Sequence, residues 1–131
     1  MRDMTDNIGA VTALSAQTIT TSAVSGAIVD TLGFNSLTFI VTAGTITDGT
    51  VAATLTEGDA ANLSDGAAVT ADGILGTLPS FAATDDNKTK RVGYSGSRRY
   101  VRLTLTPTGA TSGGTYAAVA VLGHPSSAPV A

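Results

Sequence analysis

The chain contains no run of ten residues in which apolar side chains recur every three or four positions, so it lacks the pattern of an amphipathic helix. Apolar residues instead alternate with polar ones over short segments, which is typical of half-buried β-strands. Leu37, Phe39 and Val41 share one face of such a segment, and Val101 and Leu105 belong to another, which runs from 100 to 106. Clusters of Gly, Asp and Ser separate the segments. The pattern predicts an all-β fold of antiparallel strands, either a jelly roll or a related β-sandwich or small barrel.

Two further segments refine this prediction. Asp48-Gly49 lies between two runs that favour β structure and supplies the positive-φ positions of a tight two-residue turn, so we expect a β-hairpin there. Its outgoing strand places Val51 and Leu55 on one face. Residues 116–122 are apolar on both faces, which is the pattern of a central strand.

The length of 131 residues fits a single domain. Residues 1–16 mix polar and small side chains without a period, so we expect an N-terminal arm. The first strong β signal is the Thr-rich segment Gln17–Ser22, and residues 17–131 are expected to form one β-sandwich domain. Pro125 and Pro129 predict an extended C-terminal tail.

Composition excludes several classes of protein. A hydrophobic fraction of 43% with only 13% charged residues is too apolar for a disordered chain. Aromatic residues make up 5% and Trp is absent, so the core must consist of small aliphatic side chains, and an oligomer or partner would add stability. The absence of Cys removes disulfides and thiolate metal sites. No segment is apolar and long enough to predict a membrane-spanning helix, and Met1–Ala10 does not have the pattern of a secretory signal.

The charges are unevenly distributed. The net charge of −3 argues against a general nucleic-acid-binding protein. Every basic residue except Arg2 lies between 88 and 102, namely Lys88, Lys90, Arg91, Arg98, Arg99 and Arg102. An acidic stretch precedes them, consisting of Asp48, Glu57, Asp59, Asp65 and Asp72. The two stretches could form a head-to-tail contact between subunits, or they could neutralise each other within one chain.

No arrangement of residues predicts an active site or a cofactor site. His124 is the only histidine and precedes a proline in a polar tail, so we expect it to be structural or exposed. Asp85-Asp86 and Glu57-Asp59 do not match an EF-hand or another metal-binding spacing and are interpreted as solvated turns. The basic run also contains Tyr94 and Tyr100, which could stack on bases, but the acidic net charge makes protein docking the better interpretation. The chain is therefore not predicted to be an enzyme.

Several segments resemble small proteins of tailed bacteriophages and prophages. They read NSLTFIVTAGTITDGT, LTEGDAANLSDGAAV, SGSRRYVRLTLTPTG and AVAVLGHPSSAPVA, and the resemblance extends from about Ile28 to the C-terminus. Members of this group resemble head-associated accessory proteins, and similar small β-rich phage proteins act as capsid decoration (cement) proteins. The resemblance supplies no catalytic residues, and from the residues themselves we expect no cofactor and no binding to nucleic acid or membrane.

This resemblance also implies partners and a location. The chain would be made in the bacterial cytoplasm and would bind the major capsid protein on the outer surface of the virion, as a homo-oligomer of two or three copies. The shell would then be stabilised by linkage, because only the assembled shell binds the chain. The expected contacts are the six clustered basic residues and the N-terminal arm. Two alternatives remain open: a glycan-binding or host-adhesion module, and a head-to-tail connector or tail subunit. Exposed Tyr and Asp side chains on one rim would be evidence for the first.

Overall fold

The computed structural model describes residues 2–127 and contains ten β-strands and three short 3-10 helices in that range. The six long strands are β1 (Gly9–Ile19), β2 (Val24–Asp30), β3 (Phe34–Ile46), β4 (Thr50–Gly58), β9 (Tyr100–Thr108) and β10 (Gly114–Pro125). The shorter strands are β5 (Ala67–Ala68), β6 (Ile74–Leu75), β7 (Ser80–Phe81) and β8 (Thr89–Tyr94). The 3-10 helices are η1 (Thr5–Asn7), η2 (Ala71–Gly73) and η3 (Ala83–Asp85). No helix in this part of the chain is long and apolar enough to cross a membrane.

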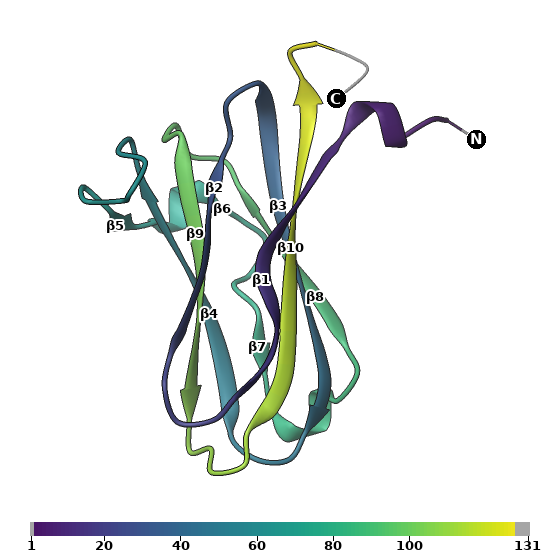
Figure 1. Ribbon diagram of the computed structural model, residues 1–131, viewed down its shortest axis with the longest axis vertical. Helices are drawn as coiled ribbons and strands as arrows, with labels where there is room; N and C mark the ends of the chain where they lie inside the picture. Colours follow the sequence, from purple (N-terminus) through teal and green to yellow (C-terminus); the bar gives the residue numbers. More distant parts are fainter. Residues whose placement is uncertain (1, 128–131) are drawn as a thin grey trace.

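The strands form two antiparallel sheets that pack face to face (Figure 1). Sheet A has the order β1-β10-β3-β8-β6, and sheet B has the order β2-β9-β4-β5, with β7 paired to β4. Strands β1 to β4 therefore alternate between the two sheets, and so do β8, β9 and β10. This connectivity is that of a jelly roll and confirms the predicted all-β sandwich.

The core lies between the two sheets and is apolar throughout. Alternate residues of the long strands point into it, as the sequence pattern predicted: Leu37, Phe39 and Val41 from β3, Val51, Ala53 and Leu55 from β4, and Val101, Leu103 and Leu105 from β9 are all buried. Four of the six aromatic residues are also buried, and the Phe81 and Tyr116 rings meet edge to face at 5.7 Å. The few large side chains of this chain are thus concentrated in the centre of the sandwich.

The predicted hairpin at Asp48-Gly49 is wrong. Strand β3 belongs to sheet A and β4 to sheet B, so the turn crosses from one sheet to the other and its two strands do not pair. The Asp48 carboxylate instead accepts hydrogen bonds from the backbone N–H groups of the β9–β10 loop, including that of Gly113 at 2.7 Å. Gly49 has the positive φ of +77° that the dipeptide predicted. Local turn chemistry was therefore recognised correctly, but it does not determine which strands pair.

The predicted N-terminal arm is too long. Residues 9–16 belong to β1, which pairs with β10 along one edge of sheet A, so only the segment before Gly9 precedes the first strand. The register shifts between Thr12 and Leu14 and again between Leu14 and Gln17. These bulges place Ala13 and Leu14 in the core consecutively, which interrupts the period of two by which a strand is recognised. The strand also ends at Ile19, before the end of the Thr-rich segment expected to be the first strand.

The segment from β5 to β7, residues 67–81, covers one flank of the sandwich, and we call it the closing segment. Strand β6 pairs with β8 of sheet A, whereas β5 and β7 pair with β4 of sheet B. Pro79 accepts a hydrogen bond from the Ala53 N–H at 2.9 Å, and Phe81 inserts its ring into the core. This segment therefore bridges the two sheets on the side where β4 and β8 would otherwise leave the core open.

At the C-terminus, β10 continues to Pro125, which pairs with Phe34, and the Ser126 N–H donates to the Gly33 carbonyl. The tail is thus docked on the body of the protein as far as the structure describes it. Pro129, the second proline of the predicted tail, lies outside the described residues.

Candidate interaction surfaces

Four of the six clustered basic residues form ion pairs within the chain. Arg99 holds the Asp30 carboxylate with two hydrogen bonds of 2.8 Å, and this pair lowers the pKa of Asp30. Arg98 pairs with Asp59, and Lys88 and Lys90 both pair with Asp85. Only the Arg98–Asp59 pair joins the basic cluster to the acidic stretch as the sequence suggested, whereas Asp30 and Asp85 lie outside that stretch.

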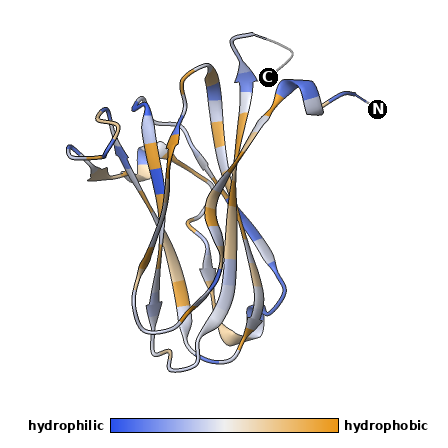
Figure 2. Ribbon diagram, in the orientation of Figure 1, coloured by the Kyte–Doolittle hydropathy of each residue, from blue (hydrophilic) through white to orange (hydrophobic). Residues whose placement is uncertain are grey.

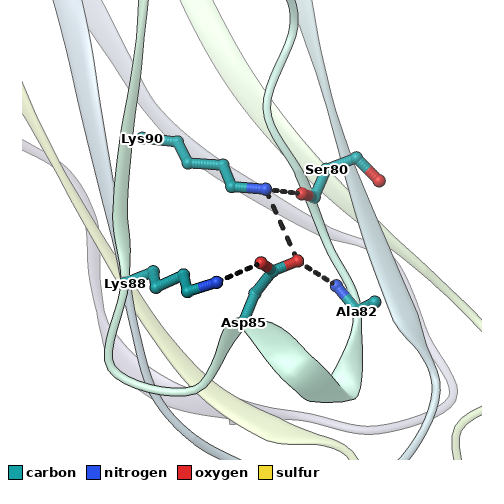
Figure 3. A network of polar contacts seen from close by, with 5 residues as sticks. All are labelled: Ser80, Ala82, Asp85, Lys88 and Lys90. Carbon is teal, nitrogen blue, oxygen red and sulfur yellow. Dashed lines mark hydrogen bonds and ion pairs between the residues drawn. The ribbon is translucent and has the colours of Figure 1, made fainter.

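The pairs made by Lys88 and Lys90 form a network at one end of the closing segment (Figure 3). The Asp85 carboxylate accepts the Ala82 N–H at 2.9 Å and lies 3.3 and 3.4 Å from the two ammonium groups. The backbone hydrogen bond is the main cause of the lowered pKa of Asp85. The Lys90 ammonium also donates to the Ser80 carbonyl and lies 5.0 Å from the centre of the Phe81 ring. These contacts attach the turn after η3 to the closing segment.

A second polar cluster joins the two sheets at the opposite end. The Tyr94 hydroxyl donates to Glu57 at 2.5 Å and accepts the Arg98 N–H at 3.0 Å. Burial, followed by the Glu57 carboxylate, raises the pKa of Tyr94 to about 12. Asp65 accepts the backbone N–H groups of Asp59 and Ala60, which holds the β4–β5 loop in place. Glu57 is therefore half-buried between the sheets, whereas the Asp59 side chain, which pairs with Arg98, is 57% exposed.

Arg91 and Arg102 make no ion pair with any described residue, and each lies on the outer face of a different sheet. Arg91 is exposed on β8, next to Ile40 of β3. Arg102 lies on β9 between Ile28 of β2 and Thr56 of β4. Its Nε is buried and has no hydrogen-bond partner among the described residues. Because this atom has no exposed surface, a partner could reach Arg102 only through the exposed part of its side chain.

The outer face of sheet A carries few charges. We define it as the outward-pointing residues of four neighbouring strands: Ala10 and Thr12 of β1, Ala117, Val119 and Val121 of β10, Thr38, Ile40 and Thr42 of β3, and Thr89 and Arg91 of β8. Val119 is 42% exposed in the middle of this face. Figure 2 shows that β10 is not strongly hydrophilic until its last residues. The sequence indicated this face through residues 116–122, which are apolar on both sides. That pattern was interpreted as a central strand and not as an exposed apolar face.

Two shallow, open grooves border the same face. They lie on either side of Leu75, whose side chain is 57% exposed and rests on Gly93. The larger, of about 740 Å³, runs between β8 and the segment 75–80, and the smaller, of about 400 Å³, leads towards Phe34 and Arg98. Neither encloses a set of acid, base and nucleophile.

The remaining polar residues singled out in the sequence take part in ordinary packing. The His124 ring lies 3.0 Å from the Ser36 hydroxyl, a contact between β10 and β3. Asp86 accepts the Ile46 N–H at 3.0 Å. Within residues 2–127 no three His, Cys, Asp or Glu side chains come together in a group that could hold a metal ion.

Exposed tyrosines, which together with aspartates on one rim would favour a glycan-binding module, are largely missing from the described surface. Tyr94 and Tyr116 are buried, and only Tyr100 reaches the outside. Tyr100 lies opposite Asp30, but that carboxylate is bound by Arg99, whose guanidinium lies 5.0 Å from the Tyr100 ring centre. No rim with several free tyrosines and aspartates is formed.

No protein-family model matches the chain, and no curated protein sequence matches it. Solved structures do share its fold. The SPBc2 prophage-derived protein YomS superposes with a TM-score of 0.55 at 15% identity, over 88% of this chain and 92% of YomS. The PBSX exported protein XepA gives a TM-score of 0.56 at 18% identity, and the match covers 88% of this chain but 37% of XepA. The N-terminal cellulose-binding domain of β-1,4-glucanase C from Cellulomonas fimi has a TM-score of only 0.42, too low to bear on function. At these identities the comparisons establish one conclusion: the chain has the β-sandwich fold that YomS and XepA share.

Proposed function

We propose that this chain is a structural protein of a tailed phage or prophage virion, which binds the major capsid protein on the outside of the head as a decoration or cement protein. The observation that carries the proposal is the distribution of charge. Four of the six basic side chains of the cluster are paired internally, and the other two, Arg91 and Arg102, lie on the outer faces of the two sheets. A rigid sandwich with two flat contact faces suits adhesion to a protein lattice better than chemistry on a small ligand.

Two other lines of argument support this function. The sequence resembles small head-associated proteins of phages, and two prophage-derived proteins share its fold, one of them over nearly its whole length. The grooves beside Leu75 are open and shallow, as expected for contact with an extended surface. Binding free energy that is available only on the assembled shell would stabilise the shell against disruption.

The outer face of sheet B is the better candidate for the shell contact. It presents Arg102, a half-buried cation without an ion-pair partner among the described residues, in a row between Ile28 and Thr56. An acidic group or carbonyl of the capsid protein would complete the hydrogen bonding of this guanidinium. If Arg102 forms such a pair at the centre of the contact, removing its side chain should weaken binding strongly. Removing an exposed charge at the rim of the contact should change binding little.

The test is binding of the purified chain to intact heads that were assembled without it, measured by co-sedimentation and by counting copies in electron-microscopic reconstructions. The wild-type chain should bind at a defined number of sites and raise the temperature at which the heads release DNA. Arg102→Ala should weaken binding by about tenfold or more. Lys88→Ala, which removes a 58% exposed ammonium from the Asp85 network, is the matched control and should bind as the wild type does.

Two results would contradict the proposal. The first is a folded chain that does not associate with heads of the phage or prophage that encodes it. The second is binding to host-cell polysaccharide in the absence of any binding to heads, which would favour the host-adhesion alternative. Binding to heads that Arg102→Ala leaves unchanged would retain the function and transfer the contact to another surface, with Arg91 as the next residue to test.

A further inference from the structure

One strand of sheet A has an edge that lacks a neighbouring strand. Strand β8 pairs with β3 along its whole length without a register shift. On its other side it pairs with β6 only at its last two residues, Gly93 and Tyr94, because the chain leaves the sheet after Leu75. Gly76, with a positive φ of +87°, follows at the point where the chain leaves. Residues 89–92 of β8 therefore have a sheet partner on one side only.

The direction of the backbone groups shows what this edge offers. In an antiparallel ladder the N–H and C=O of one residue point to the same side, and those of the next residue point to the opposite side. The Ser95 N–H donates to the Gly73 carbonyl on the β6 side, and the Lys88 carbonyl accepts an N–H of β3. The backbone groups of Thr89 and Arg91 therefore point away from β3. No described residue forms a hydrogen bond with these N–H and C=O groups.

A groove lies beside this edge and continues the line of β6. It is the larger of the two grooves next to Leu75, of about 740 Å³, and runs between β8 and residues 76–80 of the closing segment. Lys90 reaches across its inner side to donate to the Ser80 carbonyl (Figure 3), and Leu78 packs against the core there. An extended chain in this groove would lie beside β8 in the position that β6 occupies further along the strand.

The lining of the groove is positive, although the chain as a whole is acidic. Among the described residues that line it are Lys90 and Arg91 but no Asp or Glu. Lys90 is held by Asp85, whereas Arg91 is exposed and makes no ion pair with a described residue. A cation at a strand edge also opposes pairing with an identical strand, because the two guanidinium groups would lie close together. The charge thus favours an acidic partner strand over a second copy of β8.

We propose that the edge of β8 is a strand-addition site for an extended acidic segment of a partner protein. The segment adds to sheet A as the neighbour of residues 89–92, where Thr89 and Arg91 each offer one backbone donor and one backbone acceptor. This inference goes beyond the proposed shell contact, which uses the outer face of sheet B, and does not depend on it.

The alternation of side chains sets the chemistry of the added segment. Arg91 points to the outer face of sheet A, and the side chain of the residue that pairs with it points the same way. That residue should be Asp or Glu. The residues on either side of it point inwards, towards the stem of Lys90 and towards Leu78, where apolar side chains fit. The preferred occupant therefore has one acidic residue between two apolar residues.

The experiment is a nuclear magnetic resonance titration of the isotope-labelled full chain with the peptide acetyl-Ser-Val-Glu-Val-Ser-amide. The amide signals of Thr89 and Arg91 should shift, because their N–H groups gain an acceptor. The amides of Lys90 and Val92 point to β3 and should shift less. The same peptide with Lys in place of Glu should bind about tenfold more weakly or not at all.

A second peptide separates strand addition from simple attraction of charges. A methyl group on the backbone nitrogen of its Glu residue removes the N–H that would donate to the Arg91 carbonyl, and it keeps the carboxylate. This peptide should bind about tenfold more weakly. Binding equal to that of the unmodified peptide would overturn strand addition.

Arg91→Gln should weaken binding of the Glu peptide by about threefold to tenfold, because it removes the exposed cation and retains the backbone edge. The matched control is Thr54→Glu, which makes the chain more negative by the same amount at an exposed position on the outer face of sheet B. It should bind the peptide as the wild type does. Equal weakening by both variants would mean that net charge alone drives binding, and it would overturn the site.

The free chain gives a further check. The Thr89 and Arg91 amides should exchange with solvent faster than those of Lys90 and Val92, and equally slow exchange would overturn the inference, since their N–H groups would then already be bonded. Peptide-induced shifts confined to other strands would overturn it as well. A chain that binds heads but not the Glu peptide would overturn the strand-addition site alone and leave the shell contact standing.

Discussion

Aspartate side chains organise the loops of this protein one residue at a time. Asp48 holds the β9–β10 loop, Asp65 the β4–β5 loop and Asp86 the backbone of Ile46, each by accepting backbone N–H groups. Because a loop at the end of a sandwich has no ladder partner, such acceptors replace the missing strand contacts. Most acidic residues of the described chain therefore have a structural task, which is why the acidic pairs in the sequence do not mark a reaction site.

Tyr94 is the residue whose polar group is most deeply involved in the structure. Tyr94→Phe would leave the Glu57 carboxylate and the Arg98 N–H without their partner, so we expect the free energy of unfolding to fall by about 1 to 3 kcal/mol. Urea unfolding followed by circular dichroism measures the change. Tyr100→Phe is the control, because no described residue forms a hydrogen bond with that hydroxyl, and its midpoint should stay at the wild-type value.

The raised pKa of Tyr94, about 12, gives this contact a second readout. The fold favours the neutral phenol, so its contribution to stability is complete below pH 10 and is lost as the pH rises towards 12. A spectrophotometric titration of the wild-type chain should therefore show fewer tyrosines ionising near pH 10 in the folded state than after unfolding in urea, where all three ionise; burial raises the pKa of Tyr116 as well. Ionisation of all three tyrosines together near pH 10 in the native protein would contradict the contact.

At the scale of elements, the approach of β1 to β2 closes the flank of the sandwich opposite the closing segment. A Cβ atom on Gly26 of β2 would lie 2.0 Å from the carbonyl oxygen of Ala13, in the bulged part of β1. The two edge strands can come this close only because residue 26 has no side chain. The bulges and this glycine therefore act together to cover the core where neither sheet has a further strand.

Gly26→Ala should destabilise the protein by about 1 to 3 kcal/mol, because the obstructing atom is backbone and both strands would have to move apart. Thermal unfolding measures the effect as a lowered Tm. Gly123→Ala on β10 is the matched control: its new Cβ would meet only the rotatable Ser36 hydroxyl, so the loss should be clearly smaller. Equal Tm values for the two variants would show that the strands do not approach each other in this way.

At the scale of the whole molecule, ionised carboxylates at both ends of the sandwich make the stability of the fold sensitive to acid. The pKa values of Asp30, Asp48, Asp65 and Asp85 are lowered from 3.8, by the Arg99 side chain for the first and mainly by backbone N–H groups for the other three. A carboxyl group with a lowered folded pKa stabilises the protein above its unfolded pKa, and this stability is lost as the pH falls through the folded value. We therefore expect Tm to change little between pH 7 and pH 5 and to fall steeply below pH 4.

Asp48→Asn is the variant that checks the origin of this acid sensitivity. It removes one of the four carboxylates, so the fall in Tm between pH 5 and pH 3 should be less steep than in the wild-type chain. Asp72→Asn is the control, since no described residue forms a hydrogen bond with that carboxylate, and its profile should match that of the wild type. A Tm that stays constant down to pH 3 in the wild-type chain would contradict the structural role of these aspartates.

The sequence alone predicted the class of fold and the inward faces of its main strands. Alternation in 37–41, 51–55 and 101–105 is a local property of a strand with one buried face, so the core residues of β3, β4 and β9 could be read directly. It also predicted the six basic residues as candidate contacts, and four of these form ion pairs within the chain. It missed most of β1, because two bulges shift the alternation within that strand.

Pairing and charge partners were decided only by the tertiary structure. Asp48-Gly49 has the residues of a hairpin turn, but these residues determine only the local backbone conformation of the turn. Strand pairing depends instead on which sheet the whole following strand joins. In the same way, Arg98 meets Asp59 and Arg99 meets Asp30 across 39 and 69 positions of sequence. Contacts between residues so far apart arise from the crossing of strands between two sheets, and they determine which cations remain for a partner.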